Sequence, residues 1–183
     1  MATNKTNMGG GLATGMAYRA PENTALPSTP METLAADWEL IGAVGEDGLN
    51  WALGKDDQSL KNWAKKIVRV ISSDNNGSIK VPFIDTTADT LGTIFGASNV
   101  TETAATNTHG NITAVTIAPG VSAAPAAYLF LMKDGDDMML VGTTSGVITT
   151  VDDITLAPNE PITWNATIES DSFTFIKDDG QTT

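Results

Sequence analysis

The sequence predicts a mainly β protein in which two antiparallel sheets pack together, as in a sandwich or barrel, with one short α-helix. Short apolar runs recur along the chain between turn signals, which is typical of such folds. Only 17% of the 183 residues are charged, and Thr, Ser, Asn and Gly take their place. Thr favours pleated strands, and Gly and Asn favour turns, so composition and pattern agree.

The first expected strands are residues 38–44 and 49–53, joined by the turn residues Glu46-Asp47-Gly48. Residues 54–66 are polar and allow two interpretations. The spacing of Leu60, Trp63 and Ala64 would suit a short helix, whereas the polarity suits a long exposed hairpin loop, which we favour.

A hairpin is expected next. Residues 67–72 are rich in β-branched side chains, and Asp74-Asn75-Asn76-Gly77 is a strong turn signal before a returning strand at 79–83. Pro82 cannot donate a hydrogen bond, which places this strand at an edge or a bulge.

One helix is expected. Thr86 or Thr87 can cap it, Leu91, Ile94 and Phe95 share one face, and Gly96 can end it. After a polar loop at 97–111, short strands are expected to follow one another. Their ranges are 112–117, 127–132, 138–141, 147–156, 162–168 and 173–176.

The chain divides into three expected parts. Residues 1–36 have no sustained periodicity and are rich in Gly and Pro, so they are expected to form an extended arm, one candidate for its contacts being a neighbouring subunit. Residues 37–177 are expected to form a single β domain, and residues 178–183 a short tail.

The formal net charge of −12 argues against a conventional nucleic-acid binder, because such a surface repels phosphate. It would suit a surface past which nucleic acid slides, or simply solubility. No apolar run approaches the length of a membrane helix, and residues 1–11 lack an apolar signal core. We therefore expect no membrane association.

Catalytic chemistry finds little support. The single histidine, His109, lies in a polar loop, and no cysteine is present for a thiolate or a zinc site. The adjacent acidic pairs, such as Asp56/Asp57 and Asp152/Asp153, lack the spacing of a calcium loop. We expect no catalytic, metal-binding or cofactor-binding residues, and no enzyme activity.

A resemblance emerges from the order of several motifs. The segment Gly15-Met16-Ala17-Tyr18-Arg19-Ala20-Pro21 precedes Trp38-x-x-x-Gly42 and Gly45-Glu46-Asp47-Gly48-Leu49. A polar loop ending at Asn62-Trp63-Ala64, the strand Ile67-Val68-Arg69-Val70, the short helix and the C-terminal β run follow. Over residues 11–176 this order resembles the major tail tube protein of long, non-contractile phage tails.

The resemblance implies a structural subunit whose strands complete an inner barrel shared between subunits. It implies homo-oligomeric, hexameric rings that stack into a tube through which double-stranded DNA passes. The net charge of −12 adds the expectation of an acidic lumen to which the DNA does not stick. The implied partners are a tape-measure protein and the initiator and terminator proteins of the tail. The implied location is the virion tail, after assembly in the host cytoplasm.

Two groups of residues are expected to make the subunit contacts. An inter-ring loop would comprise Lys55, Asp56, Asp57, Gln58, Ser59, Leu60 and Lys61. Contacts of the N-terminal arm would involve Tyr18, Arg19 and Pro21. The alternative function is a β-sandwich binding module, for carbohydrate or for capsid decoration, because Trp38, Trp51, Trp63 and Trp164 could also form a sugar-stacking surface.

Overall fold

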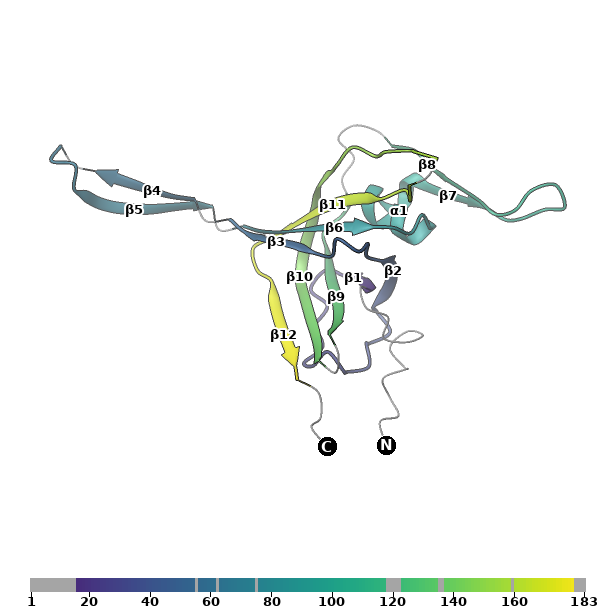
Figure 1. The fold of residues 1–183 in the computed structure, drawn as a ribbon, viewed down its shortest axis with the longest axis horizontal. Coiled ribbons are helices and arrows are strands. Elements are labelled where there is room, and N and C mark those ends of the chain that lie inside the picture. The colour runs from purple at the N-terminus through teal and green to yellow at the C-terminus, as the bar shows by residue number, and fades with distance from the viewer. Residues whose placement is uncertain are drawn as a thin grey trace.

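A computed structural model describes residues 16–54, 56–61, 63–74, 76–117, 123–134, 137–158 and 160–179. Figure 1 shows a β-sandwich body from which two hairpins project in different directions. The elements are β1 (Met16–Pro21), β2 (Glu39–Ala43), β3 (Asn50–Leu53), β4 (Asp56–Lys61), β5 (Ile67–Asp74), β6 (Gly77–Phe83), α1 (Ala88–Phe95), the 3-10 helix η1 (Ala97–Asn99), β7 (Val100–Thr103), β8 (Ile112–Val115), β9 (Ala126–Asp134), β10 (Asp137–Val151), β11 (Trp164–Ser170) and β12 (Thr174–Asp178). The predicted mainly β class with one α-helix is confirmed for the described part of the chain.

The body is one eight-stranded antiparallel sheet that folds over on itself along β10. The first half of β10 pairs with β9 and β12, and its last residues pair with β11. We call the layer β2-β1-β9-β10-β12 sheet 1 and the layer β10-β11-β6-β3 sheet 2. The sequence predicted two strands, at 138–141 and 147–156, where the structure has the single strand β10. The register of β10 against β9 shifts between Thr143 and Gly146, where β10 passes from one layer to the other.

The opposite side of the sandwich is partly closed by direct bonds between the layers. Val44, just after β2, forms a β-bridge with Phe83 at the end of β6. The Gly45 N–H donates to the carbonyl of Pro82 at 2.7 Å, and the Ile84 N–H donates to the carbonyl of Ala43 at 3.2 Å. The body is therefore barrel-like at this end.

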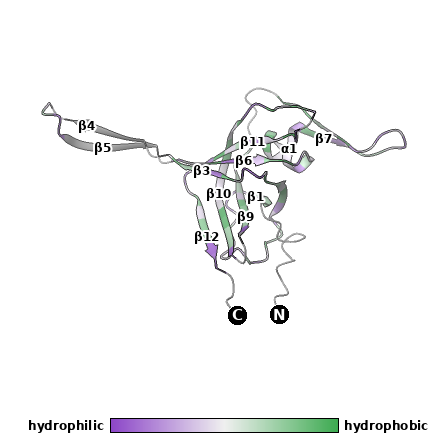
Figure 2. Cartoon of the chain, in the orientation of Figure 1, coloured by the Kyte–Doolittle hydropathy of each residue, from purple (hydrophilic) through white to green (hydrophobic). Residues whose placement is uncertain are grey.

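The main core fills the space between the two layers. Ala17, Tyr128 and Phe130 contribute from sheet 1, and Ile79, Val81, Phe83 and Ile168 from sheet 2. Figure 2 shows hydrophobic residues concentrated on the body strands. β9 is buried on both faces from Ala126 to Leu131, which explains its unbroken apolar sequence.

Helix α1 closes one end of this core. The Thr87 hydroxyl oxygen accepts a hydrogen bond from the Thr90 N–H at 3.2 Å, so Thr87 is the predicted N-cap. Leu91, Ile94 and Phe95 are buried, and the Phe95 ring meets Trp164 edge to face at 5.7 Å. The predicted helix and its apolar face are confirmed.

A second core lies on the outer face of sheet 1. Tyr18, Trp38, Leu129 and Leu140 are buried there, and Leu26 and Leu34 pack against them. The segment between β1 and β2 thus covers the sheet of its own subunit. Gly142 permits this, because a Cβ atom there would come within 2.8 Å of Leu26 and 2.9 Å of the Tyr128 carbonyl.

The expected N-terminal arm is therefore partly integrated into the body. Met16–Pro21 form β1, which lies between β2 and β9. This strand was not predicted from the sequence, because Ala17, Tyr18 and Ala20 are all buried and no alternation of apolar and polar residues marks it. The division into arm, domain and tail remains a prediction.

The prediction of a hairpin turn at Asp74-Asn75-Asn76-Gly77 is wrong. β5 does not pair with β6: β4 pairs with β5, and β3 pairs with β6. The four strands instead form one long hairpin whose chain reversal lies near Trp63–Lys66. β6 lies between β3 and β11, so it is not an edge strand over its whole length. Its ladder with β3 stops at Lys80, before Pro82. The proline therefore costs no hydrogen bond to β3.

Part of the expected polar loop at 97–111 is also ordered as strand. Val100–Thr103 pair with Ile112–Val115 to form the second projecting hairpin. All residues from Thr101 to Ala114 are exposed. Because neither strand has a buried face there, the sequence carries no apolar periodicity that could have predicted the pairing.

Candidate assembly surfaces

The long hairpin is the most protruding part of the molecule (Figure 1). The Gly54 N–H donates to the carbonyl of Asn76 at 2.9 Å, which continues the ladder from the β3–β6 stem into the β4–β5 ribbon. At the tip, Lys65 has a φ of +60°, as a tight reversal requires. The Trp63 side chain is 103% exposed. Tryptophan is enriched at protein interfaces, so a fully exposed tryptophan makes the tip of the hairpin a candidate contact surface.

The residues predicted as an inter-ring loop lie in this hairpin. Lys55 is outside the described residues, and Asp56–Lys61 form β4, which pairs with β5. The alternative of a short helix for this segment is wrong, and the expected loop is a two-stranded ribbon instead. The role of these residues in joining rings remains a prediction.

A further signal in the sequence, not used in the predictions above, is the uneven distribution of charge along the chain. Residues 55–74 hold five of the ten cationic side chains and three of the 22 acidic ones, a net charge of +2, which leaves −14 for the rest of the chain. Residues 58–73 contain four cationic residues and no acidic one. The outer part of the hairpin is thus cationic, whereas the body is strongly acidic.

The three residues predicted for contacts of the arm lie on β1 and are not equivalent. Tyr18 is 3% exposed and belongs to the second core of its own subunit. Arg19 is half-buried and lies beside Glu39 and Asp89 in a shallow depression next to α1. Pro21 is exposed. A contact with another subunit through Tyr18 would need the second core to open, so Arg19 and Pro21 are the surface residues of this group.

One outer edge of sheet 1 is capped within the subunit. The Ala43 N–H on β2 donates to a carboxylate oxygen of Asp85 at 2.7 Å, and the Thr90 hydroxyl donates to the Ile41 carbonyl at 2.9 Å. Gly42 has a φ of +156°, and a Cβ atom there would lie 2.7 Å from the same Asp85 oxygen. These contacts use the backbone groups that another strand would need.

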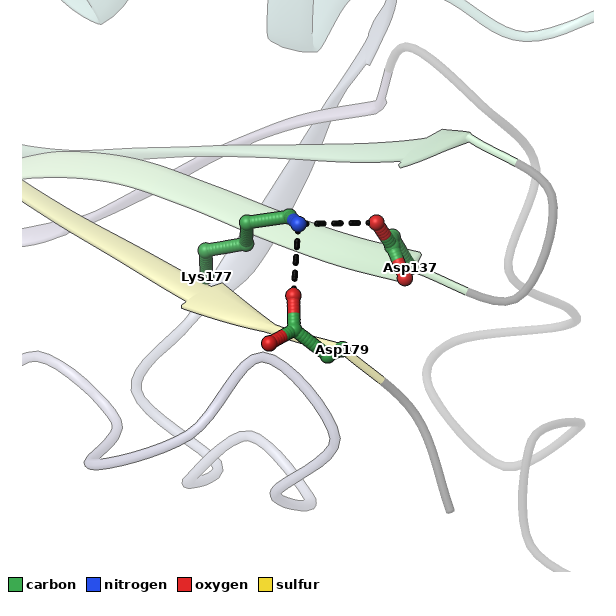
Figure 3. A network of polar contacts seen from close by, with 3 residues as sticks. All are labelled: Asp137, Lys177 and Asp179. Carbon is green, nitrogen blue, oxygen red and sulfur yellow. Dashed lines mark hydrogen bonds and ion pairs between the residues drawn. The ribbon is translucent and has the colours of Figure 1, made fainter. Parts of the chain in front are cut away.

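The other outer edge of sheet 1 is β12, which pairs only with β10 among the described strands. Lys177 fixes its end: its Nζ lies 2.8 Å from an Asp137 carboxylate oxygen and 2.5 Å from one of Asp179 (Figure 3). The two hydrogen-bonded carboxylates raise the pKa of Lys177. The ladder to β10 sets the register of β12, and these solvent-exposed ion pairs add to it at the strand end.

An apolar groove runs between the exposed edges of the two layers. One part, of about 340 Å³, is lined by the turn after β2, including Glu46 and Leu49, and by Met132 on β9. The adjoining part, of about 280 Å³, shares Leu49 and Met132 and adds Trp51 and Phe175. Trp51 is 39% and Phe175 48% exposed. Large apolar side chains exposed together in this way indicate an interaction surface.

The structure assembles no chemical centre in the part of the chain that it describes. No group of three or more His, Asp or Glu side chains there could hold a metal ion. His109 is exposed in the loop of the β7–β8 hairpin, where its Nδ1 lies 2.7 Å from the Gly110 carbonyl. Asp152 forms an ion pair with Lys80. No helix among the described residues is both long and apolar enough to cross a lipid bilayer.

A β-sandwich with a projecting hairpin and an exposed apolar groove, and with no chemical centre among its described residues, is typical of a structural protein whose surfaces serve assembly. The sequence comparison agrees: residues 1–182 match the phage tail tube protein family, and the chain belongs to it. The protein is thus a structural component of the virion tail, where it takes part in an oligomeric assembly, and it is not an enzyme. No curated protein matches the chain.

Proposed function

We propose that this protein is the repeating subunit of a long, non-contractile phage tail, and that it forms stacked hexameric rings whose bore conducts double-stranded DNA to the host. The observation that carries the proposal is the long hairpin of this tail tube family member, which projects from the body and exposes Trp63 at its tip. A ribbon of two strands is marginal in isolation, so a surface that receives it would stabilise it.

Strand pairing between subunits would supply the inner barrel. Among the described strands β12 pairs only with β10, whereas the edge of β2 is occupied by Asp85 and Thr90. Joining β12 to a strand of the next subunit would extend sheet 1 across the subunit boundary and cover this outer strand. A contact between two different surfaces of identical subunits repeats around an axis, and it closes into a ring when the rotation allows.

The charge of the body suits a DNA conduit. Six copies would carry a formal charge of −72, from −12 per chain. Acidic side chains facing the bore would repel the phosphate backbone and keep the duplex from binding to the wall. A tape-measure protein and the initiator and terminator proteins of the tail would set the length of the tube, and assembly would take place in the host cytoplasm.

The hairpin provides the experiment. Residues 55–75 are replaced by Asn-Gly, which joins Gly54 to Asn76 by a tight turn and leaves the β3–β6 stem intact. The shortened chain should unfold at nearly the same urea concentration as the full chain but should form no tubes. The matched control replaces residues 104–111 of the β7–β8 hairpin by Asn-Gly. Normal tubes from the first variant would remove the long hairpin from the mechanism.

A further inference from the structure

We infer that the tip of the long hairpin docks into the apolar groove of a second copy of this chain, with the Trp63 indole in the groove and Lys65 beside Glu46 and Asp47 at its rim. The inference rests on the proposed self-assembly and names the two surfaces that meet. Three observations carry it: the exposure of Trp63, the composition of the groove, and the separation of charge along the chain.

The two surfaces match in shape and chemistry. Trp63 is fully exposed at the end of the ribbon. The groove offers aliphatic and aromatic side chains, namely Leu49, Met132, Val141, Trp51, Phe130 and Phe175. Burying a tryptophan in a pocket lined by aliphatic and aromatic side chains is the usual form of an interface hot spot. The two parts of the groove, of about 340 and 280 Å³, leave room for an indole ring.

The charges match as well. Lys65 is exposed at the tip, next to Trp63, and the outer hairpin has a net charge of +4 over residues 58–73. Glu46 lines the groove, and Asp47 is exposed beside it. Two acidic bodies repel each other, so a cationic extension directed at an acidic rim both steers the encounter and selects the docking site.

The tip cannot reach the groove of its own subunit, so a second copy is the occupant that we infer. Trp63 lies ten positions after Leu53, the end of the stem, which corresponds to about 33 Å of strand. Figure 1 shows this ribbon leading away from the body, whereas Trp51 at its base lines the groove. The tip of one subunit therefore points away from its own groove. Tip and groove are different surfaces, so the contact can repeat from copy to copy.

Cysteine cross-linking of full-length chains tests the docking directly, because the sequence contains no cysteine. One chain carries Ala64→Cys at the tip, and a second carries Asp47→Cys at the rim. The two are mixed under mild oxidation. A disulfide requires Cα atoms within about 7 Å, so a mixed dimer reports the contact. The control partner carries Thr108→Cys, which is exposed on the other hairpin.

The mixed Ala64→Cys and Asp47→Cys dimer should form in clear excess over the Thr108→Cys control. Adding Trp63→Ala to the tip chain should weaken the association about 30-fold. Lys65→Glu should weaken it about three-fold, and Glu46→Lys in the rim chain should restore part of the loss. Leu156→Ala removes a comparably exposed apolar side chain elsewhere and should change nothing.

Two results would overturn the inference: cross-linking to the rim no better than to Thr108→Cys, or full cross-linking by the Trp63→Ala chain. Tubes formed normally by Trp63→Ala chains would also overturn it, while leaving the tail tube function in place. A wild-type chain that never forms tubes, yet cross-links specifically from tip to rim, would contradict the proposed function and retain the docking contact.

Discussion

Trp51 on β3 meets Phe173, in the turn before β12, edge to face, with ring centroids 6.1 Å apart and ring planes inclined by 68°. Phe173 also covers Gly77 on β6, where a Cβ atom would come within 2.8 Å of the ring. This pair joins the exposed edge of sheet 2 to the strand that ends sheet 1, directly beside the apolar groove. It therefore fixes the relative position of two surfaces that assembly is proposed to use.

A double-mutant cycle should detect this coupling. Trp51→Leu and Phe173→Leu each remove the ring–ring contact, and together they should be less destabilising than the sum of the single changes, by about 0.5–1.5 kcal/mol. Urea unfolding of the unassembled chain gives the four free energies. Strict additivity would show that the two rings do not stabilise one another.

Tyr128 should respond to alkaline pH. Its side chain is fully buried, and its hydroxyl has no hydrogen-bond partner among the described residues. Burial raises the pKa of Tyr128 to about 12, and the positive charge of Arg19 lowers it by a smaller amount. Between pH 10 and 12 the unfolded chain loses this proton while the folded chain keeps it, so folding stability should fall, by up to about 2.7 kcal/mol.

Tyr128→Phe isolates this contribution. The variant should be at least as stable as the wild type at pH 7, because the lost hydroxyl was buried without a partner. Above pH 10 it should become progressively more stable than the wild type. Urea unfolding of both chains at pH 7, 10 and 11 makes the comparison. A loss of stability above about 1 kcal/mol at pH 7 would instead indicate a hydrogen bond to the hydroxyl.

The N-cap of α1 should contribute measurably. Thr87→Ala removes the acceptor for the Thr90 N–H and should lower the free energy of unfolding by about 1 kcal/mol. Thr87→Ser keeps the acceptor and serves as the control. Equal stability of the alanine and serine variants would show that the hydroxyl does not stabilise the helix.

Gly142 should tolerate no side chain. Gly142→Ala would force its Cβ against Leu26 and against the backbone carbonyl of Tyr128, so it should cost about 1–3 kcal/mol. Gly110→Ala is the matched control, because no atom lies within 4 Å of the added carbon. Thermal unfolding compares the two. Similar melting temperatures would mean that the segment over sheet 1 is free to move away.

Local signals in the sequence predict much of the body. Thr87, Leu91 and Gly96 define the helix, because capping and helical spacing act over a few residues. β1 was missed because burial on both faces removes its alternation. The Asp74–Gly77 segment was wrongly predicted to be a hairpin turn. A turn signal does not say which strands pair with each other, and β5 pairs with β4 rather than with β6.

The assembly surfaces were harder to predict. The polarity of residues 55–61 indicated an exposed segment, and the family resemblance gave it a role. The groove cannot be read from the sequence, since Leu49, Met132 and Phe175 come from three distant segments that meet only in the fold. The charge difference between hairpin and body can be read from the sequence, and the structure adds that the cationic segment projects from the acidic body.

Electron microscopy of the purified full-length chain tests the central claim most directly. The chain is concentrated at low and at high salt, with and without preformed tail tips as nucleators, and viewed in negative stain. We expect hollow tubes of uniform width built from stacked rings. Isolated globular particles under every condition would contradict self-assembly of this chain into a tail tube.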